Sequence, residues 1–475
     1  MHLSGRLQSF IIPLYLAAIV LVLIPLGSVQ IIPQSMATVL VSIVGLLAVL
    51  FNSRPTRNAA TFAVALGIFI VLTAWILFQT AGFAPAGLHN PLWQDVAAWS
   101  ADSIATISLQ PADTIASLSF VTLPFLTFLT GLILCDKDDD RARLVIAGLG
   151  WIGATAALIG LLQFNLSPTS LMLGEKRAYL DSLTAVFVNR NTAATFLGLA
   201  VLICVRRLWS VSGSAFEALS GARSGRTTTR VNSTQAILYG LMLCMIVTAL
   251  FLTKSRAGIA STFVASIILV AFLALSPSQS KRATFSSDPS SKRKILMRVL
   301  IGLIGLTLVF VLFGGRALLR AETQGTEDAR FCIFPAITEL AKNNWLQGTG
   351  FGTFRNAFAP YRDPSCGVGF LWDRAHNFYL EGAVGLGLVS WLVLIFGLGY
   401  LIVVLIGGLR KRRQQKSYVA LGIASLVLVA LHGLVDFSLE IPGMACYFAA
   451  LLAATVSMAK KPAQSESRSR SKVPA

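Results

Sequence analysis

Two arginines stand where apolar segments of the chain begin, and their side chains are suited to binding phosphate. Arg190 lies in the sequence N-R-N-T-A-A-T-F and Arg256 lies in S-R-A-G. A guanidinium group beside hydrocarbon is costly unless it binds an anion or reaches the polar interface. Arginine keeps its charge and binds phosphate bidentately, so a pair suits a diphosphate on which negative charge grows. For either arginine alone, contact with lipid phosphates is an equally simple interpretation.

One histidine, His376, has the position of a candidate general base. It is one of only four histidines, and it stands with Asn377 immediately before an apolar segment. A histidine side chain titrates near pH ~6.5, so it can accept a proton from a sugar hydroxyl at neutral pH. A histidine that caps a helix, or that hydrogen-bonds within a loop, would show the same pattern. The residue alone leaves that alternative open.

A second ionisable pair, His432 and Asp436, lies close to another apolar segment. The two residues are four apart, so we expect them on one helix face. Ionisable residues inside a membrane are candidates for function, which makes a proton relay one interpretation. A mutually satisfied pair that orders the last two helices is the simpler interpretation, and we prefer it.

The elements that must position these side chains are membrane-spanning helices. The 475 residues are 55% hydrophobic and only 13% charged, whereas a soluble domain has about 25% charged residues. Apolar stretches long enough to cross a membrane, about 20 residues each, recur throughout the chain. We therefore expect an all-α integral membrane protein with about 12 transmembrane helices, at residues 10–27, 34–51, 60–79, 117–135, 144–164, 190–205, 234–253, 257–275, 297–314, 379–405, 418–435 and 441–459.

A polar segment separates the ninth predicted span from the tenth and is expected to form one large loop that carries His376. The predicted division places spans one to nine in residues 1–315 and this loop in 316–378. Spans ten to twelve then fall in 379–459, and a disordered tail follows in 460–475.

The net charge of +18 is explained by the expected topology. Most of the 39 Lys and Arg residues fall at the two termini and in the loops of one side. Because cytoplasmic loops are enriched in Lys and Arg, both termini are predicted to be cytoplasmic. Arg190, Arg256 and the large loop with His376 then lie on the opposite, periplasmic side. The charge gives no reason to expect a nucleic-acid partner.

Two of the six cysteines, Cys332 and Cys366, share the large loop. In an oxidising compartment they could form a disulfide that holds the loop together. Two separately packed free thiols are the alternative, because the sequence does not show whether the two Cα atoms come within ~7 Å.

Taken together, these motifs resemble the O-antigen ligase and polymerase family of bacterial inner-membrane glycosyltransferases. The resemblance covers roughly residues 189–443. It rests on the order of N-R-N-T-A-A-T-F, S-R-A-G, G-T-G-F-G-T-F, A-H-N-F-Y-L-E-G-A-V-G-L-G-L and H-G-L-V-D-F-S-L-E-I-P-G.

The resemblance implies a multi-pass protein that transfers a glycan from an undecaprenyl-diphosphate-type carrier to an acceptor sugar at the periplasmic face. Arg190 and Arg256 match the family's diphosphate-binding arginines, and His376 matches its proposed general base. Arg330 matches a basic position early in the loop. No cofactor or metal is implied, and direct displacement would invert the anomeric configuration.

The chain departs from the family pattern near the histidine. Ser390 replaces the last residue type of the histidine motif, and Phe378 and Gly385 stand where acidic residues are frequent. These departures concern the acceptor side more than the donor side.

Several alternatives remain open at the level of sequence. A ligase of lipopolysaccharide biosynthesis and a polymerase of surface polysaccharide or exopolysaccharide share the donor and differ in the acceptor. A transporter or flippase for a lipid-linked or anionic substrate is the competing class. Charges near one face and the lack of an inverted repeat count against it.

Overall fold

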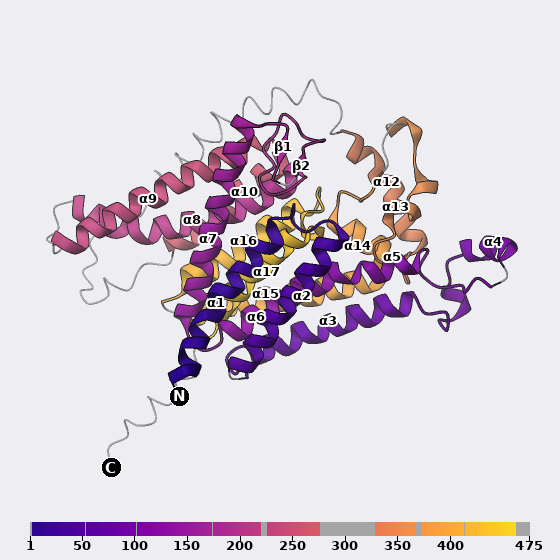
Figure 1. Cartoon of the computed structure of the whole chain (residues 1–475), viewed down its shortest axis with the longest axis horizontal. Helices are drawn as coiled ribbons and strands as arrows, with labels where there is room; N and C mark the ends of the chain where they lie inside the picture. Colours follow the sequence, from indigo (N-terminus) through magenta and orange to yellow (C-terminus); the bar gives the residue numbers. More distant parts are fainter. Residues whose placement is uncertain are drawn as a thin grey trace, which may run out of the picture.

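The structure is a computed structural model that describes residues 2–52, 54–100, 102–172, 174–219, 226–275, 328–366, 372–412 and 414–461. Long helices lie side by side in a bundle, and α12 and α13 gather near one end of it (Figure 1). The described elements are α1 (His2–Leu23), α2 (Ile31–Phe51), α3 (Ala59–Gln79), η1 (Ala86–Leu88), α4 (Leu92–Trp99), α5 (Pro111–Ala116), α6 (Leu118–Leu134), α7 (Asp139–Leu166), β1 (Ser170–Leu171), β2 (Gly174–Glu175), α8 (Arg190–Leu219), α9 (Arg226–Leu252), α10 (Arg256–Leu275), α12 (Asp328–Asn343), α13 (Phe354–Ala357), η3 (Ala359–Tyr361), η4 (Pro364–Cys366), α14 (Phe378–Leu386), α15 (Leu388–Lys411), α16 (Lys416–His432), η5 (Ser438–Glu440) and α17 (Pro442–Ala459).

The predicted all-α membrane fold is confirmed, and the span count is supported in part. Within the described residues, nine helices are long and apolar enough to cross a membrane, and two shorter apolar helices are Phe10–Leu23 and Lys416–His432. The predicted span at 297–314 lies outside the described residues. The total of twelve therefore stays a prediction.

The short β1–β2 pair is antiparallel, with Ser170 opposite Glu175.

The most buried helix is α17, whose membrane-length window is 94% buried. Its sequence is rich in Ala, and small residues let membrane helices approach closely. Gly131 of α6 illustrates this, since a Cβ there would stand 2.7 Å from the Cβ of Ala453. By contrast, the corresponding windows of α3, α9 and α15 are at most 22% buried, which is expected of helices that face lipid.

Three predicted boundaries were wrong. Between the predicted spans 190–205 and 234–253, the chain instead continues α8 to Leu219 and starts α9 at Arg226. The predicted span 379–405 is broken at Gly387, whose φ of +61° separates α14 from α15. Helix α16 ends at His432, so Asp436 lies in a turn rather than on the same helix face.

The glycine-rich segment 348–354 forms a tight turn that fixes α14. Gly348, Gly350 and Gly352 all have positive φ, which costs glycine little. The backbone N–H of Thr349 donates to the carbonyl of Val384, and that of Gly350 donates to Gly385. A Cβ at Gly348 would meet the Gly385 carbonyl oxygen at 2.4 Å. Only glycine allows this approach.

An acidic segment closes the opposite end of the bundle. Asp136 accepts hydrogen bonds from the backbone N–H groups of Thr56 and Asn58, at 2.9 and 2.7 Å. Asp139 pairs with Arg57 at 2.6 Å and also with Arg412. The segment 136–143 therefore joins α3, α7 and the end of α15.

Replacing Asp139 with Asn should destabilise the protein by about 3 kcal/mol, because the fully buried Arg57 side chain loses its charge partner. The measurement is thermal unfolding of the purified protein. Asp140→Asn is the matched control, since Asp140 pairs with Arg143 but is 83% exposed. Equal unfolding midpoints for the two variants would contradict the structural role of Asp139.

Candidate active site

Arg190 begins α8, and its side chain lies against Tyr179 and Ser182 of the preceding loop. Asn189 accepts a hydrogen bond from the Asn191 backbone N–H at 2.7 Å, which stabilises the first turn of the helix. The Arg190 guanidinium lies 5.4 Å from the centre of the Tyr179 ring and 3.5 Å from the Ser182 hydroxyl. The half-buried arginine is thus held at the end of the bundle, which we call the site end.

Two lysines that the sequence did not single out lie beside Arg190. Lys254, in the short turn between α9 and α10, pairs with Asp181 at 2.6 Å, and Lys176 donates to the carbonyl of Ser182. The hydrogen bond from Lys254, followed by the smaller effects of Ser182 and Arg190, lowers the pKa of the Asp181 carboxyl. Arg190, Lys254 and Lys176 thus gather around the carboxylate of Asp181, which leaves a net positive charge on this group of residues.

Arg256 begins α10 at the same end of the bundle and is exposed. The turn before it is tied to the Arg190 loop, because the Leu183 backbone N–H donates to the Leu252 carbonyl at 2.8 Å. Helices α8 and α10 pack against each other. The structure therefore brings the two predicted arginines to the starts of neighbouring helices.

His376 sits in a strained turn immediately before α14. Its φ of +53° is uncommon for a residue other than glycine and is the kind of strain found at functional sites. The imidazole lies edge-to-face between the rings of Trp372 and Phe437, at 5.6 and 5.0 Å. Asn377 caps α14 by accepting hydrogen bonds from two backbone N–H groups. The two aromatic rings and the capped helix fix the direction of the imidazole.

The turn that follows α16 is bonded directly to the His376 turn. The Phe378 backbone N–H donates to the Gly433 carbonyl at 2.9 Å, and the Asn377 side chain donates to the Leu434 carbonyl at 2.8 Å. The conformation of the His376 turn therefore depends on residues about 57 positions further along the chain.

The predicted pair of His432 and Asp436 is connected through α8. The His432 ring lies 2.6 Å from the Thr195 hydroxyl, which also bonds Ser438 at 2.9 Å. Ser438 in turn donates to Asp436. Asp436 also accepts a hydrogen bond from the Asn191 side chain at 3.1 Å. The two residues are therefore linked through Thr195, Ser438 and Asn191, and they do not share one helix face.

A buried ionic group beside His376 was missed by sequence reasoning. Arg374 lies 3.6 Å from Glu381 and 3.1 Å from Glu440, and Glu381 also accepts the Ala375 backbone N–H at 2.5 Å. Burial, with a further contribution from Glu381, raises the pKa of Glu440 well above its ordinary value, although Arg374 opposes this. Two carboxyl groups thus share one arginine directly behind the His376 turn.

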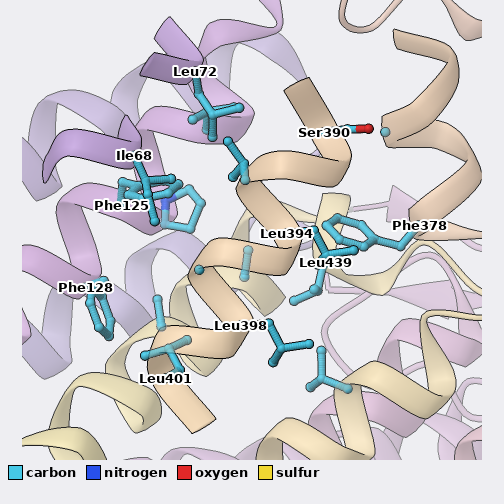
Figure 2. A pocket seen from close by; sticks show the side chains of 18 of the residues that line it. Ile68, Leu72, Phe125, Phe128, Phe378, Ser390, Leu394, Leu398, Leu401 and Leu439 are labelled. Atoms are coloured by element: carbon cyan, nitrogen blue, oxygen red, sulfur yellow. The ribbon is translucent and has the colours of Figure 1, made fainter. Parts of the chain in front are cut away.

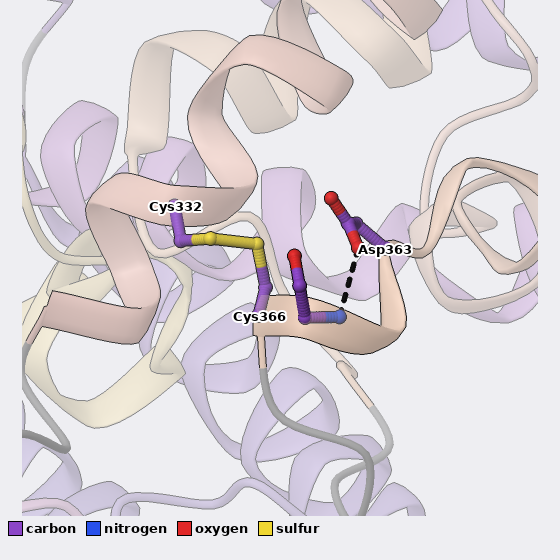
Figure 3. Close-up of a disulfide and its surroundings, with 4 residues drawn as sticks. Cys332, Asp363 and Cys366 are labelled. Carbon is purple, nitrogen blue, oxygen red and sulfur yellow. Dashed lines mark hydrogen bonds between the residues drawn. A yellow bond between two sulfur atoms is a disulfide. The ribbon is translucent and has the colours of Figure 1, made fainter.

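The remaining predicted site residues fall at the edge of this arrangement. Cys332 of α12 and Cys366 of η4 are joined by a disulfide with a Cα–Cα distance of 5.7 Å (Figure 3). Arg330 lies in α12, but its side chain is outside the part of the chain that is described. Among the described residues, no group of three or more His, Cys, Asp or Glu could hold a metal ion.

These observations define a multi-pass helical membrane protein with a polar site at one end of its bundle. Residues 240–395 match the family model described as O-Antigen ligase. The resemblance predicted from the motifs is thereby confirmed over residues 240–395. The matched segment includes Arg256 and His376, whereas Arg190 and Asp436 lie outside it. No curated protein matches the chain.

The disulfide can be tested by counting accessible thiols. Denatured, unreduced protein should take up four maleimide labels, at Cys135, Cys204, Cys244 and Cys446. After reduction it should take up six. Gel shift with a maleimide polymer gives the count. Six labels before reduction, in protein purified without reductant, would contradict the bridge.

Proposed function

We propose that the protein is a glycosyltransferase that moves a glycan from an undecaprenyl-diphosphate-type carrier to an acceptor hydroxyl at the periplasmic face of the inner membrane. One observation carries the proposal. Arg190 and Arg256, the first residues of α8 and α10, lie at the same end of the bundle as the turn that contains His376. The family match supports the general reaction class.

The basic side of the site is suited to the donor diphosphate. Arg190 and Arg256 would bind phosphate oxygens bidentately, and Lys254 and Lys176 would add positive charge beside them. As the bond between the anomeric carbon and the diphosphate oxygen breaks, the electron pair stays on the diphosphate. Fixed cations stabilise that charge more as it develops, which lowers the barrier.

His376 is suited to the acceptor step. Its imidazole would take the proton of the acceptor hydroxyl while the hydroxyl oxygen forms the new bond to the anomeric carbon. Attack opposite the leaving diphosphate inverts the configuration. The ring contacts with Trp372 and Phe437 limit its rotation, so the base is positioned before the substrate arrives.

The distribution of charge supports a periplasmic site. At the opposite end of the bundle, Arg57, Arg141 and Arg412 meet Asp138 and Asp139, and most of the 39 Lys and Arg residues of the chain fall in the loops and termini on that side of the predicted topology. Since loops rich in Lys and Arg stay in the cytoplasm, that end is the cytoplasmic one under this proposal. The site end then faces the periplasm, where a lipid-linked donor enters from the outer leaflet.

The mechanism is tested by His376→Ala in a transfer assay without nucleotide. Purified protein receives a polyprenyl-diphosphate oligosaccharide, with either a lipid A-core acceptor or further donor. Loss of the base should reduce the rate about 10²- to 10⁴-fold. His89→Ala is the matched control, because the His89 ring bonds to Ala84 within its own loop, and this variant should keep full activity.

The products of the same assay separate the possible acceptors. Product on lipid A-core would identify a ligase, and a ladder of longer carrier-linked glycans would identify a polymerase. Normal transfer by His376→Ala would contradict the proposed mechanism. No transfer by the folded wild-type protein with either acceptor would favour a different acceptor or the transporter alternative.

Lys254→Met should weaken donor binding, because it removes a cation next to Arg190. We expect the KM for the donor to rise roughly fivefold at low salt, as for a partly exposed charge contact of about 1 kcal/mol. The effect should shrink as ionic strength rises. Lys342→Met, on α12 and away from the Arg190 loop, serves as the control. An unchanged donor KM at low salt would remove Lys254 from the donor site.

A further inference from the structure

An apolar groove of about 420 Å³ lies next to the site and has no role in the mechanism so far. It is formed by α3, α6, α14, α15, α16 and α17. Figure 2 shows the hydrocarbon side chains that surround it, among them Ile68, Leu72, Phe125, Leu394 and Leu398.

The groove and the arginines lie on opposite faces of α16. Leu428 faces α8, since a Cβ added to Gly198 of α8 would stand 2.9 Å from it. His432 faces α10, since a Cβ added to Gly258 of α10 would stand 3.2 Å from it. Leu426 and Ala430 instead line the groove. Two residues along a helix correspond to a rotation of about 200°, so the two pairs point in nearly opposite directions.

The groove nonetheless ends close to His376. Phe378, two residues after His376, lines the groove, and so does Leu439, two residues after the Phe437 ring that contacts the imidazole. Figure 2 shows Phe378 and Leu439 together at this end. A molecule in the groove would therefore present its head group beside the candidate base.

Carboxyl groups mark this end of the groove. Glu381 and Glu440 both line it, and the two share the single guanidinium of Arg374. Carboxylate oxygens accept hydrogen bonds from hydroxyl groups, and a protonated carboxyl can donate one as well. Burial raises the pKa of Glu440, so this group is suited to an uncharged, hydroxyl-bearing ligand.

We propose that this groove binds the acceptor, and that the acceptor is a glycolipid whose hydrocarbon chain lies among α3, α6 and α15. Its uncharged sugar would lie beside Glu381 and Glu440, with a hydroxyl directed to His376. The proposal rests on the proposed function for the role of acceptor, but the binding site itself is defined by the groove.

The charged residues at this end of the groove favour the acceptor over the donor as the molecule that occupies it. A diphosphate at this end would meet two carboxyl groups and one arginine, and like charges in a buried site repel strongly. The cations that suit a diphosphate, Arg190 and Lys254, belong to the side of α16 that faces α8 and α10. Donor and acceptor would thus approach His376 from two sides.

The length of the groove fits the chain of an ordinary lipid. Along α15 its lining extends from Ser390 to Leu401, which is roughly 17 Å of helix at 1.5 Å per residue. That is about half of a hydrocarbon core some 30 Å thick, or one leaflet. A lipid anchored in the outer leaflet would reach the groove with its head at the level of the site.

The experiment uses photo-crosslinking of the full-length protein in phospholipid nanodiscs free of glycoside detergent. Three probes carry a diazirine in the hydrocarbon chain: an alkyl glycoside, a polyprenyl diphosphate and a phosphatidylcholine. Leu394→Trp fills the groove, and Leu392→Trp is the matched control because Leu392 lies on the same helix but is 58% exposed. Labelled peptides are mapped by mass spectrometry.

We expect the alkyl glycoside to label α6 and α15 at the groove in preference to the other probes. Leu394→Trp should reduce this labelling about tenfold, a difference of about 1.4 kcal/mol, and Leu392→Trp should leave it unchanged. In the transfer assay, Leu394→Trp should raise the KM for the acceptor by a similar factor, with no change in the donor KM.

Other outcomes would overturn the proposal. Preferred labelling by the polyprenyl diphosphate would assign the groove to the donor chain, and equal labelling by phosphatidylcholine would make it a lipid-filled surface. Labelling does not require transfer, so it remains informative if the proposed function fails. If Leu394→Trp is active and its KM for the acceptor is unchanged, the groove is not the acceptor site, whereas the proposed function stands.

Discussion

The site depends on the pairing of polar groups in the turn between α16 and α17, residues 433–441. This turn is surrounded by apolar helices, where a buried polar group without a partner costs about 1–3 kcal/mol. Asp436 accepts a hydrogen bond from Asn191 of α8, the Gly433 carbonyl accepts one from the Phe378 backbone N–H, and Glu440 forms an ion pair with Arg374. Because one turn provides all of these partners, the start of α8 and the His376 turn are held in a fixed relation.

The same turn explains why His376 can keep a strained backbone. A left-handed conformation at a residue other than glycine costs of order 1–3 kcal/mol and persists only where its surroundings require it. Here α14 is held from three directions, by the turn after α16, by Arg374 with Glu381, and by the glycine-rich turn at Gly348. The energetic cost of the strained backbone at His376 is therefore offset by contacts with residues outside the His376 turn.

The sequence predicted much of the fold because membrane helices are encoded locally. Long apolar segments indicated the described spans, and Arg190, Arg256 and His376 stood out because charged and titratable groups are rare next to such segments. The break between α14 and α15 was missed, since Gly387 lies within an uninterrupted apolar pattern. His432 and Asp436 were wrongly placed on one helix because α16 ends at His432, where the chain turns at Gly433.

Two features of the site could not be predicted because they depend on contacts between distant segments. Arg374 and Glu440 are 66 residues apart, and neither lies in a distinctive motif. Lys254 and Asp181 meet only because the end of α9 is bonded to the loop before α8. The apolar groove is the extreme case, since its residues are ordinary core residues of several helices and no local pattern separates them from others.

The distribution of charge around His376 follows the needs of the proposed transfer. Negative charge would grow on the leaving diphosphate, and the cations Arg190, Arg256, Lys176 and Lys254 gather at the starts of α8 and α10 and in the loops beside them. The acceptor would approach as a neutral hydroxyl and give up a proton, and the carboxyl groups of Glu381 and Glu440 lie on that side. Exchanging the two sides would place carboxylates against a diphosphate and cations beside an imidazole that must become positive. Cations on one side of α16 and carboxyl groups on the other therefore favour both departure of the diphosphate and attack by the acceptor. A lipid-facing scaffold would not require this separation of charge.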